Sequence, residues 1–149
     1  MSFFDTLEIV SSGMKAQKTR MNVSAMNMAN KGTTRTAEGG PYRRRDVVLE
    51  AVPVDNAPFA QRLESMMSGR EEEFLGVRVA QISQSEDPPE LVYDPSHPDA
   101  NAEGYVAMPN VNGIKEMVNM MSAARAYEAG TKVLKTVRTM AQQALKIGK

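Results

Sequence analysis

The chain has no cysteine, no tryptophan and only one histidine among its 149 residues. Without cysteine it forms neither disulfide bonds nor a thiolate zinc site, and four Phe and four Tyr give a core few large anchors. No stretch approaches the roughly 18 apolar residues of a membrane span, so we expect no direct membrane insertion. We also expect no cleavable signal peptide, because Asp5 and Glu8 interrupt the apolar run at the start of the chain.

Net charge is also absent, but only as an average over the chain. Residues 1–45 carry a charge of +5, residues 46–114 carry −10, and residues 115–149 carry +5. Basic ends around an acidic middle favour contacts between copies of the chain, either head to tail or side by side.

Both ends of the chain have the apolar spacing of long helices, which we predict at roughly 4–29 and 112–147. The candidate N-caps are Ser2 or Asp5 for the first helix and Asn110 or Asn112 for the second. A repeat of seven residues keeps one apolar stripe facing a partner helix. The predicted helix seam consists of Leu7, Val10, Met14, Met21 and Met28 near the start, and of Val133, Val137, Met140, Ala144 and Ile147 near the end. The second stripe continues upstream through Ala123, Ala126 and Gly130, where small residues permit close backbone approach. Neither end can bury its stripe alone, so the helices must pair with each other or with other copies, as in an assembling structural protein.

Between the helices the sequence predicts short strands and turns. Strand-forming residues occur at 42–54, 77–82, 91–93 and 104–106. Residues 55–75 are a variable segment, in which we expect a loop at 56–58, a short helix at 59–67 and a solvated, mobile stretch at 68–73. We therefore predict an α+β fold, with long N- and C-terminal helices that pair as a coiled coil and a small β-rich middle domain. The helical domain would comprise 1–32 and 110–149, and the outer β-rich domain 33–109.

The only histidine, His97, lies close in sequence to Asp94, Asp99 and Glu103, which suggests a site for a hard cation or for zinc. A lone histidine is a weak metal signal, however, and Asp-Pro and His-Pro-Asp are ordinary turn sequences. No nucleophile with a base in reach and no glycine-rich phosphate loop is visible. We expect no catalytic, cofactor-binding or metal-binding residues, and a metal-dependent enzyme built around His97 is the least favoured alternative.

Three consecutive arginines, Arg43 to Arg45, form a basic cluster directly after Tyr42. Nucleic-acid binding needs a wider basic face, and the centre of this chain is acidic. Alternation along a strand also places Arg43 and Arg45 on one side and Arg44 on the other. We expect these arginines to pair with acidic neighbours in the same or an adjacent subunit, and we expect no nucleic-acid partner.

Three motifs are more specific. The first ends the predicted first helix and comprises Asn27, Ala29, Asn30 and Thr33. The second surrounds a glycine turn and comprises Gly39, Gly40, Pro41, Tyr42, Arg43 and Arg44. The third comprises the turn residues Asp94, Pro95, His97, Pro98 and Asp99, then Gly104, Tyr105, Pro109 and Asn110, and finally Glu116, Met117, Tyr127 and Glu128 in the last helix. Together they resemble the flagellar axial proteins of bacteria, most closely those of the proximal rod, over roughly 1–48 and 76–149. Gly32 and Gly130 depart from the family pattern, in which asparagine is more usual at both positions.

The resemblance implies a fold and a function that agree with the residue patterns. It implies an inner coiled coil of the two terminal helices that lines a tube, an outer domain made from the middle, and export by the flagellar type III apparatus. The chain would then join copies of itself and other rod proteins in a helical, periplasm-crossing rod that encloses the export channel and transmits torque. At the rod base it would meet membrane-ring and export-gate components. The competing class is a type III secretion adaptor or binding module with a helical pair.

Overall fold

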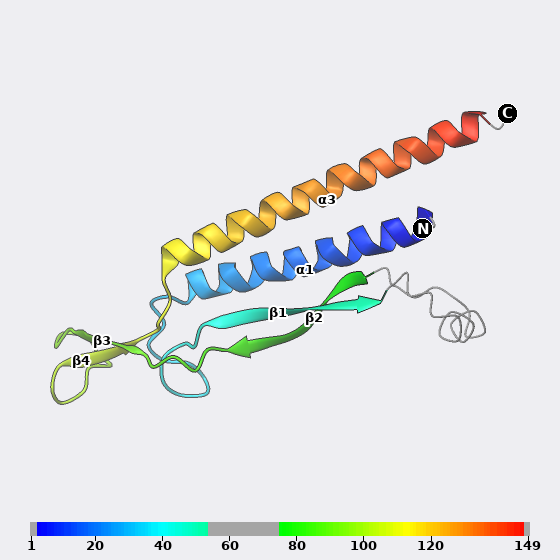
Figure 1. Cartoon of the computed structure of the whole chain (residues 1–149). Helices are drawn as coiled ribbons and strands as arrows, with labels where there is room; N and C mark the ends of the chain where they lie inside the picture. Colours follow the sequence, from blue (N-terminus) through cyan, green and yellow to red (C-terminus); the bar gives the residue numbers. More distant parts are fainter. Residues whose placement is uncertain (1–2, 54–74, 148–149) are drawn as a thin grey trace, which may run out of the picture.

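The computed structural model describes residues 3–53 and 75–147. It contains two long helices and two antiparallel hairpins (Figure 1). The elements are α1 (Phe3–Ala29), β1 (Arg45–Pro53), β2 (Leu75–Gln84), β3 (Glu90–Tyr93), β4 (Tyr105–Met108) and α3 (Gly113–Ile147). The predicted α+β class is confirmed, and both helices begin within one residue of the predicted positions. The four predicted strands are present with shifted ends, whereas the predictions for 59–67 and 68–73 lie outside the described residues.

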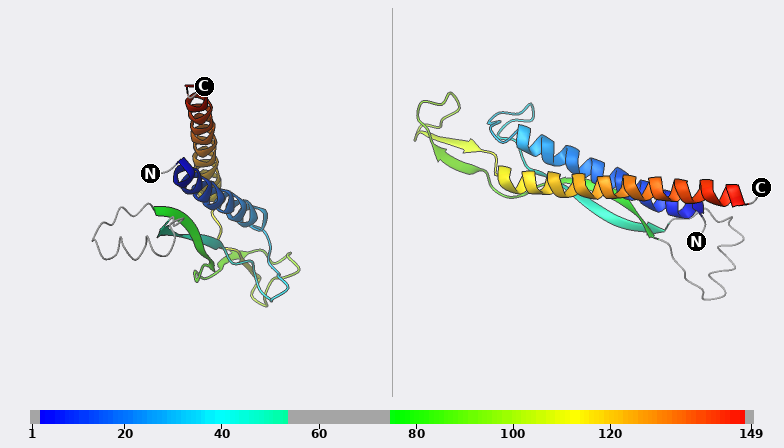
Figure 2. Two further views of the ribbon diagram at one scale, coloured as in Figure 1. Left: turned by 90° about the vertical axis from the view of Figure 1, so that its right-hand side faces the viewer. Right: turned by 90° about the horizontal axis from the view of Figure 1, so that it is seen from above.

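The elements are stacked in layers along one long axis. Seen end-on, α3 lies on one side of α1 and the β1–β2 hairpin lies on the other (Figure 2). The β3–β4 hairpin projects beyond the end where α1 finishes and α3 begins (Figure 1). The start of α1 and the end of α3 therefore lie together at the opposite end of the molecule.

The start of α3 is fixed by Asn112, one of its two candidate caps. The Asn112 Oδ1 accepts hydrogen bonds from the backbone N–H groups of Ile114 and Lys115 at 3.0 and 3.1 Å. These bonds satisfy first-turn donors that the helix itself leaves unpaired. Asn110 has a different role, because its Nδ2 donates to the carbonyl oxygen of Pro88 at 3.3 Å. Asp5 lies inside α1 and is not its N-cap.

The β1–β2 hairpin packs on α1. Its strands pair from Arg45 opposite Gln84 to Pro53 opposite Leu75, with a register shift between Val48 and Leu49 that marks a β-bulge. A polar bridge ties β2 to the helix, because the Ser12 Oγ accepts from the Val77 backbone N–H at 3.0 Å. A two-stranded hairpin is marginal in water, so contact with α1 supplies the support that it needs.

The two helices run antiparallel and pack closely. Gly113 lies against Lys31, and an added Cβ at Gly130 would lie 2.6 Å from Met14 Cγ. The predicted seam residues of α1 are all half-buried: Leu7, Val10, Met14, Met21 and Met28. Buried or half-buried positions of α3 include Glu116, Met120, Ala123, Tyr127, Gly130, Leu134, Val137 and Ala141, which alternate four and three residues apart.

The predicted seam of α3 only partly coincides with this face. Val137 is half-buried, but Val133, Met140 and Ala144 are exposed in the single chain, and of Ile147 only the backbone is described. The predicted small residues Ala123 and Gly130 do lie on the described face, where they allow the α1 side chains to approach, whereas the predicted Ala126 is exposed. Within one chain, therefore, α3 meets α1 through a stripe that overlaps the predicted one only in part, and contact of the exposed seam residues with other copies stays a prediction.

The β3–β4 hairpin is short and is closed by a glycine in the left-handed region. Tyr93 pairs with Tyr105, and their rings meet edge to face at a centroid distance of 5.3 Å. Gly104 has φ +82°, and an added Cβ there would lie 2.9 Å from Tyr93 Cε2. Only glycine adopts this conformation without strain and leaves room for the Tyr93 ring.

Replacing Gly104 with alanine should strain the hairpin by about 1–2 kcal/mol, because the new Cβ meets both an unfavourable φ and the Tyr93 ring. Faster amide hydrogen exchange at Leu91 to Tyr93 would report the loss. Gly32→Ala is the matched control, since nothing lies within 4 Å of its added Cβ. Equal exchange in the two variants would contradict the expected strain.

Candidate functional site

A buried cluster of polar side chains lies where α1, the segment before β1 and the first turn of α3 meet. We refer to Ser24, Asn27, Tyr42, Arg44 and Glu116 as the polar cluster. Asn27 and Glu116 are each only 1% exposed, and Ser24 and Tyr42 are also buried. Four of its five members belong to the predicted motifs, from three segments that are distant in sequence.

Asn27 uses both ends of its amide. Its Oδ1 accepts from the Tyr42 hydroxyl and from the Arg45 backbone N–H, each at 2.9 Å. Its Nδ2 donates to the Arg45 carbonyl oxygen at 2.8 Å. Arg45 opens β1, so one side chain of α1 holds the start of the hairpin as a neighbouring strand would. This pairing fixes where the chain turns back along α1 after the Gly39-Gly40 turn.

Glu116 joins α3 to the same point. Its Oε1 accepts from the Arg44 Nε at 2.8 Å, and Asn27 and Ser24 also donate to the carboxylate. Burial alone would raise the pKa of Glu116, but these hydrogen bonds and the positive charge of Arg44 outweigh it and hold the pKa below its ordinary value. The carboxylate is therefore ionised and fully partnered, which is the condition for burying a charge without a large penalty.

Arg44 links Glu116 to the hairpin. Its second bond runs from a terminal nitrogen to Asp46 Oδ1 at 2.6 Å. The hydrogen bond to Glu116, opposed in part by desolvation, raises the pKa of Arg44 above its ordinary value. The prediction that the arginines pair with acidic neighbours is confirmed for Arg44 within the chain.

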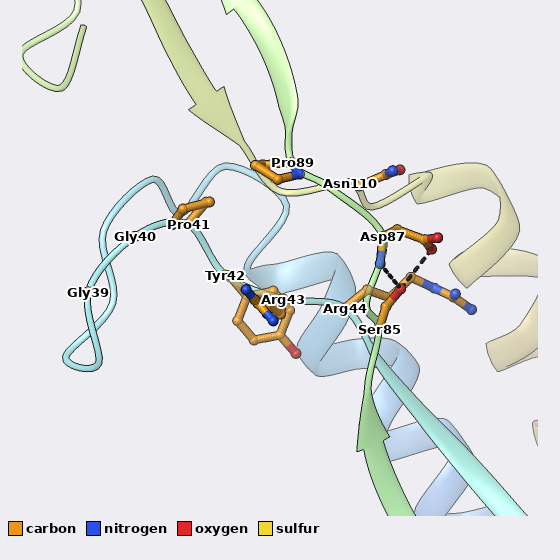
Figure 3. A pocket seen from close by; sticks show the side chains of 10 residues that line it. All are labelled: Gly39, Gly40, Pro41, Tyr42, Arg43, Arg44, Ser85, Asp87, Pro89 and Asn110. Atoms are coloured by element: carbon orange, nitrogen blue, oxygen red, sulfur yellow. Dashed lines mark hydrogen bonds between the residues drawn. The ribbon is translucent and has the colours of Figure 1, made fainter. Parts of the chain in front are cut away.

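A pocket of about 140 Å³ lies next to the polar cluster. Figure 3 shows its wall formed by the Gly39-to-Arg44 segment on one side and by Ser85, Asp87, Pro89 and Asn110 on the other. Ser85 and Asp87 are bonded to each other, with the Ser85 Oγ donating to Asp87 Oδ2 at 2.7 Å. The Arg44 side chain points out of this region toward α3, where it meets Glu116. Gly39 and Gly40, at φ +89° and +73°, provide the turn that the sequence predicts.

The third motif forms a turn between β3 and β4 that is fastened to the segment after α1. Asp99 accepts from the Thr34 hydroxyl at 2.8 Å and pairs with Arg35 at 2.9 Å. His97 holds the turn internally, because its Nδ1 accepts from the Asp99 backbone N–H at 3.1 Å. Asp94 accepts from the Ser96 hydroxyl and N–H, and these bonds lower its pKa.

These carboxylates are occupied by the turn rather than gathered around a shared centre. Within residues 3–53 and 75–147, no group of three or more His, Asp or Glu side chains is placed to hold a metal ion. No described helix is long and apolar enough to cross a membrane.

The remaining predicted residues fall into three places. Asn30 and Thr33 close the end of α1, where the Thr33 hydroxyl donates to Asn30 Oδ1 at 3.2 Å. Pro109 is buried and Tyr127 is half-buried on the α1 side of α3. The exposed ones are Ala29, Arg43, Pro95, Pro98, Tyr105, Met117 and Glu128. These exposed residues are outside the polar cluster, and any role they have lies at the surface.

Ser24 is the member that sequence reasoning missed. It lies three residues before Asn27 on α1, a spacing that puts both side chains on one helix face. A serine inside a helix more often bonds its own backbone, so this spacing alone gave no reason to expect a carboxylate partner on α3.

Replacing Gly130 with leucine should destabilise the helix pair by about 1–2 kcal/mol, because overpacking against Met14 outweighs the better helix propensity of leucine. Urea denaturation would measure the change, with Ala126→Leu at an exposed site of the same helix as the control. Adding Met14→Ala should recover part of the loss, since it empties the space that the leucine needs. Full additivity of the two changes would contradict a direct contact.

Comparison with known proteins agrees with these motifs. The family model described as flagellar basal body rod FlgEFG protein C-terminal matches residues 102–147. The chain is 42% identical to the flagellar basal-body rod protein FlgC of Bacillus subtilis, over 100% of both chains. It is 41% identical to FlgC of Borreliella burgdorferi, over 99% of this chain and 98% of that one, and 40% identical to FlgC of Salmonella typhimurium, over 99% of both. The matches span the polar cluster and both helices, and the chain belongs to the FlgC family of flagellar basal-body rod proteins.

Proposed function

We propose that this chain is a structural subunit of the flagellar basal-body rod and performs no catalysis. The observation that carries the proposal is the full-length match to proteins named for that rod. Its helices, its hairpins and its turn segments all fall within the region matched to these proteins.

The polar cluster supports a role in transmitting torque. It fastens α1, α3 and the start of the β1–β2 hairpin at one point through hydrogen bonds to Asn27 and Glu116. We place the helical domain at 1–32 plus 110–149 and the outer β-rich domain at 33–109, with the cluster at their junction. Charged and bidentate contacts fix relative orientation more strictly than apolar packing does, and a torque-transmitting subunit needs such a fixed junction.

The exposed apolar residues of α3 support assembly with other subunits. Val133 is 44% exposed, Met140 is 63% exposed and Leu145 is 75% exposed on a helix that has room for partners. We infer that α1 and α3 continue into a coiled coil with neighbouring copies and with other rod proteins, around the export channel. Export through the flagellar type III apparatus, contacts with the ring and export gate at the rod base, and a periplasmic position follow as parts of the same proposal.

Deletion of the gene in its host tests the proposal. Purified basal bodies should then lack rod and hook, and cells should be non-motile. Complementation with the unaltered gene is the control. Basal bodies with intact rods in the deletion strain would remove the structural proposal.

A second experiment separates the rod subunit from a type III secretion adaptor. Replacement of 94–111 by a neutral linker of equal length removes the β3–β4 turn and the Asp99 contacts while retaining both helices. If the protein is a rod subunit, cells with this replacement should be non-motile although they still export other flagellar proteins. Altered export of those proteins, with rods still complete, would favour the adaptor.

A further inference from the structure

The region around the β3–β4 hairpin and the last half of α3 carry opposite charge. Between Arg78 and Lys115 the chain has no Lys or Arg, and Glu86, Asp87, Glu90 and Glu103 are all exposed around the β3–β4 hairpin. We name this region the tip. Asp99 is neutralised by Arg35, and Asp87 lies near enough to Arg44 to help raise the pKa of that guanidinium. Among the described residues, Glu86, Glu90 and Glu103 make no ion pair.

The tip is also apolar at its surface. Leu91 and Tyr93 are 65% and 64% exposed, and the neighbouring Val92 and Tyr105 are exposed as well. Among the described elements, β3 and β4 pair only with each other, and neither packs on a helix or on another strand. An acidic surface that displays aromatic and aliphatic side chains and has no covering element is typical of an interaction site.

The last half of α3, which we name the tail, has the complementary composition. After Glu128 the chain contains no Asp or Glu, while Lys132, Lys135, Arg138 and Lys146 are all exposed. The exposed apolar residues Val133, Met140 and Leu145 lie in the same segment. Asp5 and Glu8 lie in the first turns of α1, but the tail itself contributes only positive side chains.

The tail also extends beyond the part of α3 that lies alongside α1. Gly113 lies against Lys31 and Gly130 against Met14, so each step along α3 is matched by one step back along α1. Phe3 therefore lies level with about Ala141, and the remaining turns of α3 extend past the described part of α1 (Figure 1).

We infer that the tip of one copy docks on the tail of a second copy of this chain. Charge complementarity selects the pair, and the exposed apolar residues of both surfaces are buried in the contact. The tip and the tail lie at opposite ends of the molecule (Figure 1), so the tip of one copy cannot contact the tail of the same copy. Such a heterologous contact repeats without closing and produces a linear or helical assembly. The inference rests on the proposed rod function and specifies which surfaces meet.

The absence of cysteine makes the contact directly testable. We would prepare Leu91→Cys at the tip, Met140→Cys in the tail and Ile114→Cys, at 78% exposure, as a matched control outside the tail. Equimolar mixtures of full-length proteins would be oxidised mildly, and linked peptides quantified by mass spectrometry. Linkage between 91 and 140 should exceed linkage between 91 and 114 by about tenfold and should fall steeply as salt is raised, because the charges become screened. Equal yields would overturn the inference.

A charge exchange provides the stricter criterion. Glu90→Lys with Glu103→Lys on the tip should abolish the 91–140 linkage, and Lys132→Glu with Lys135→Glu on the partner should restore it. Failure of the second pair to restore linkage would overturn the inference even if the first pair abolishes it.

The same cysteine variants in the host separate this contact from the function on which it rests. Basal bodies that contain the protein but lack the 91–140 linkage would overturn the contact and leave the rod function standing. Absence of the protein from basal bodies would overturn the rod function itself. Linkage inside isolated basal bodies would support both.

Discussion

Replacing Asn27 with alanine should lower the free energy of unfolding by about 3 kcal/mol or more. The substitution leaves the Arg45 N–H, the Arg45 carbonyl oxygen and the Tyr42 hydroxyl without their partner. Each buried polar group left unpaired costs about 1–3 kcal/mol, and the site is closed to water because Asn27 is 1% exposed. Urea denaturation followed by circular dichroism would measure the loss.

Asn22→Ala is the matched control, because Asn22 lies on the same helix and is exposed. Its effect should stay within about 0.5 kcal/mol, as for most surface substitutions. Asn27→Leu separates hydrogen bonding from volume, since it fills the space but offers no polar group. A stable Asn27→Leu protein would show that volume, rather than pairing with Arg45, holds the hairpin start.

Replacing Glu116 with alanine should cost about 2–4 kcal/mol. Removal of one partner of a buried ion pair leaves the other without its counter-charge, and here it also strands the donors of Asn27 and Ser24. The penalty is moderated because Arg44 is partly exposed, at 27%, and keeps its bond to Asp46. Glu128→Ala, an exposed glutamate of the same helix, should change stability little. Similar losses for Glu116→Ala and Glu128→Ala would contradict the role assigned to the buried carboxylate.

The stabilisation by the ionised Glu116 carboxylate should also appear in the pH dependence of the free energy of unfolding. The folded-state pKa of Glu116 lies below its ordinary value of 4.5, so the unfolded chain binds the proton more tightly than the folded one. The stabilisation is therefore fully present above about pH 4.5 and is lost as pH falls through the lower folded-state pKa. The stability difference between the unaltered chain and Glu116→Gln should shrink over that acidic range. A difference that stays constant there would contradict the ionised state.

Apolar spacing predicted both helices because it reflects how each element buries one side, and strand-forming residues predicted the four strands for the same local reason. It identified only part of the stripe of α3 that faces α1. The predicted small residues Ala123 and Gly130 lie on that stripe, whereas the predicted Ala126, Val133 and Met140 are exposed. Apolar spacing alone does not distinguish the stripe that faces α1 from an adjacent apolar stripe, because both have the same helical period.

The polar cluster shows a second limit. Asn27, Tyr42, Arg44 and Glu116 were each visible as motif residues, but no spacing rule connects positions separated by up to 89 places in the chain. Their convergence depends on the antiparallel arrangement of α1 and α3, which is a tertiary property. Sequence patterns therefore identify candidate site residues. The fold determines which of them meet: these four do, whereas exposed motif residues such as Met117 do not.

The polar cluster also has an order built into it. Every partner of the Asn27 Oδ1 lies within the first 45 residues, whereas Glu116 arrives 71 residues after Arg45. In a chain that emerges N-terminus first, the hydrogen bonds from Tyr42 and Arg45 to Asn27 can therefore form before Glu116 has appeared. A fragment that ends before Glu116 would retain these bonds to Asn27, but its Arg44 would lack the buried carboxylate that balances its charge.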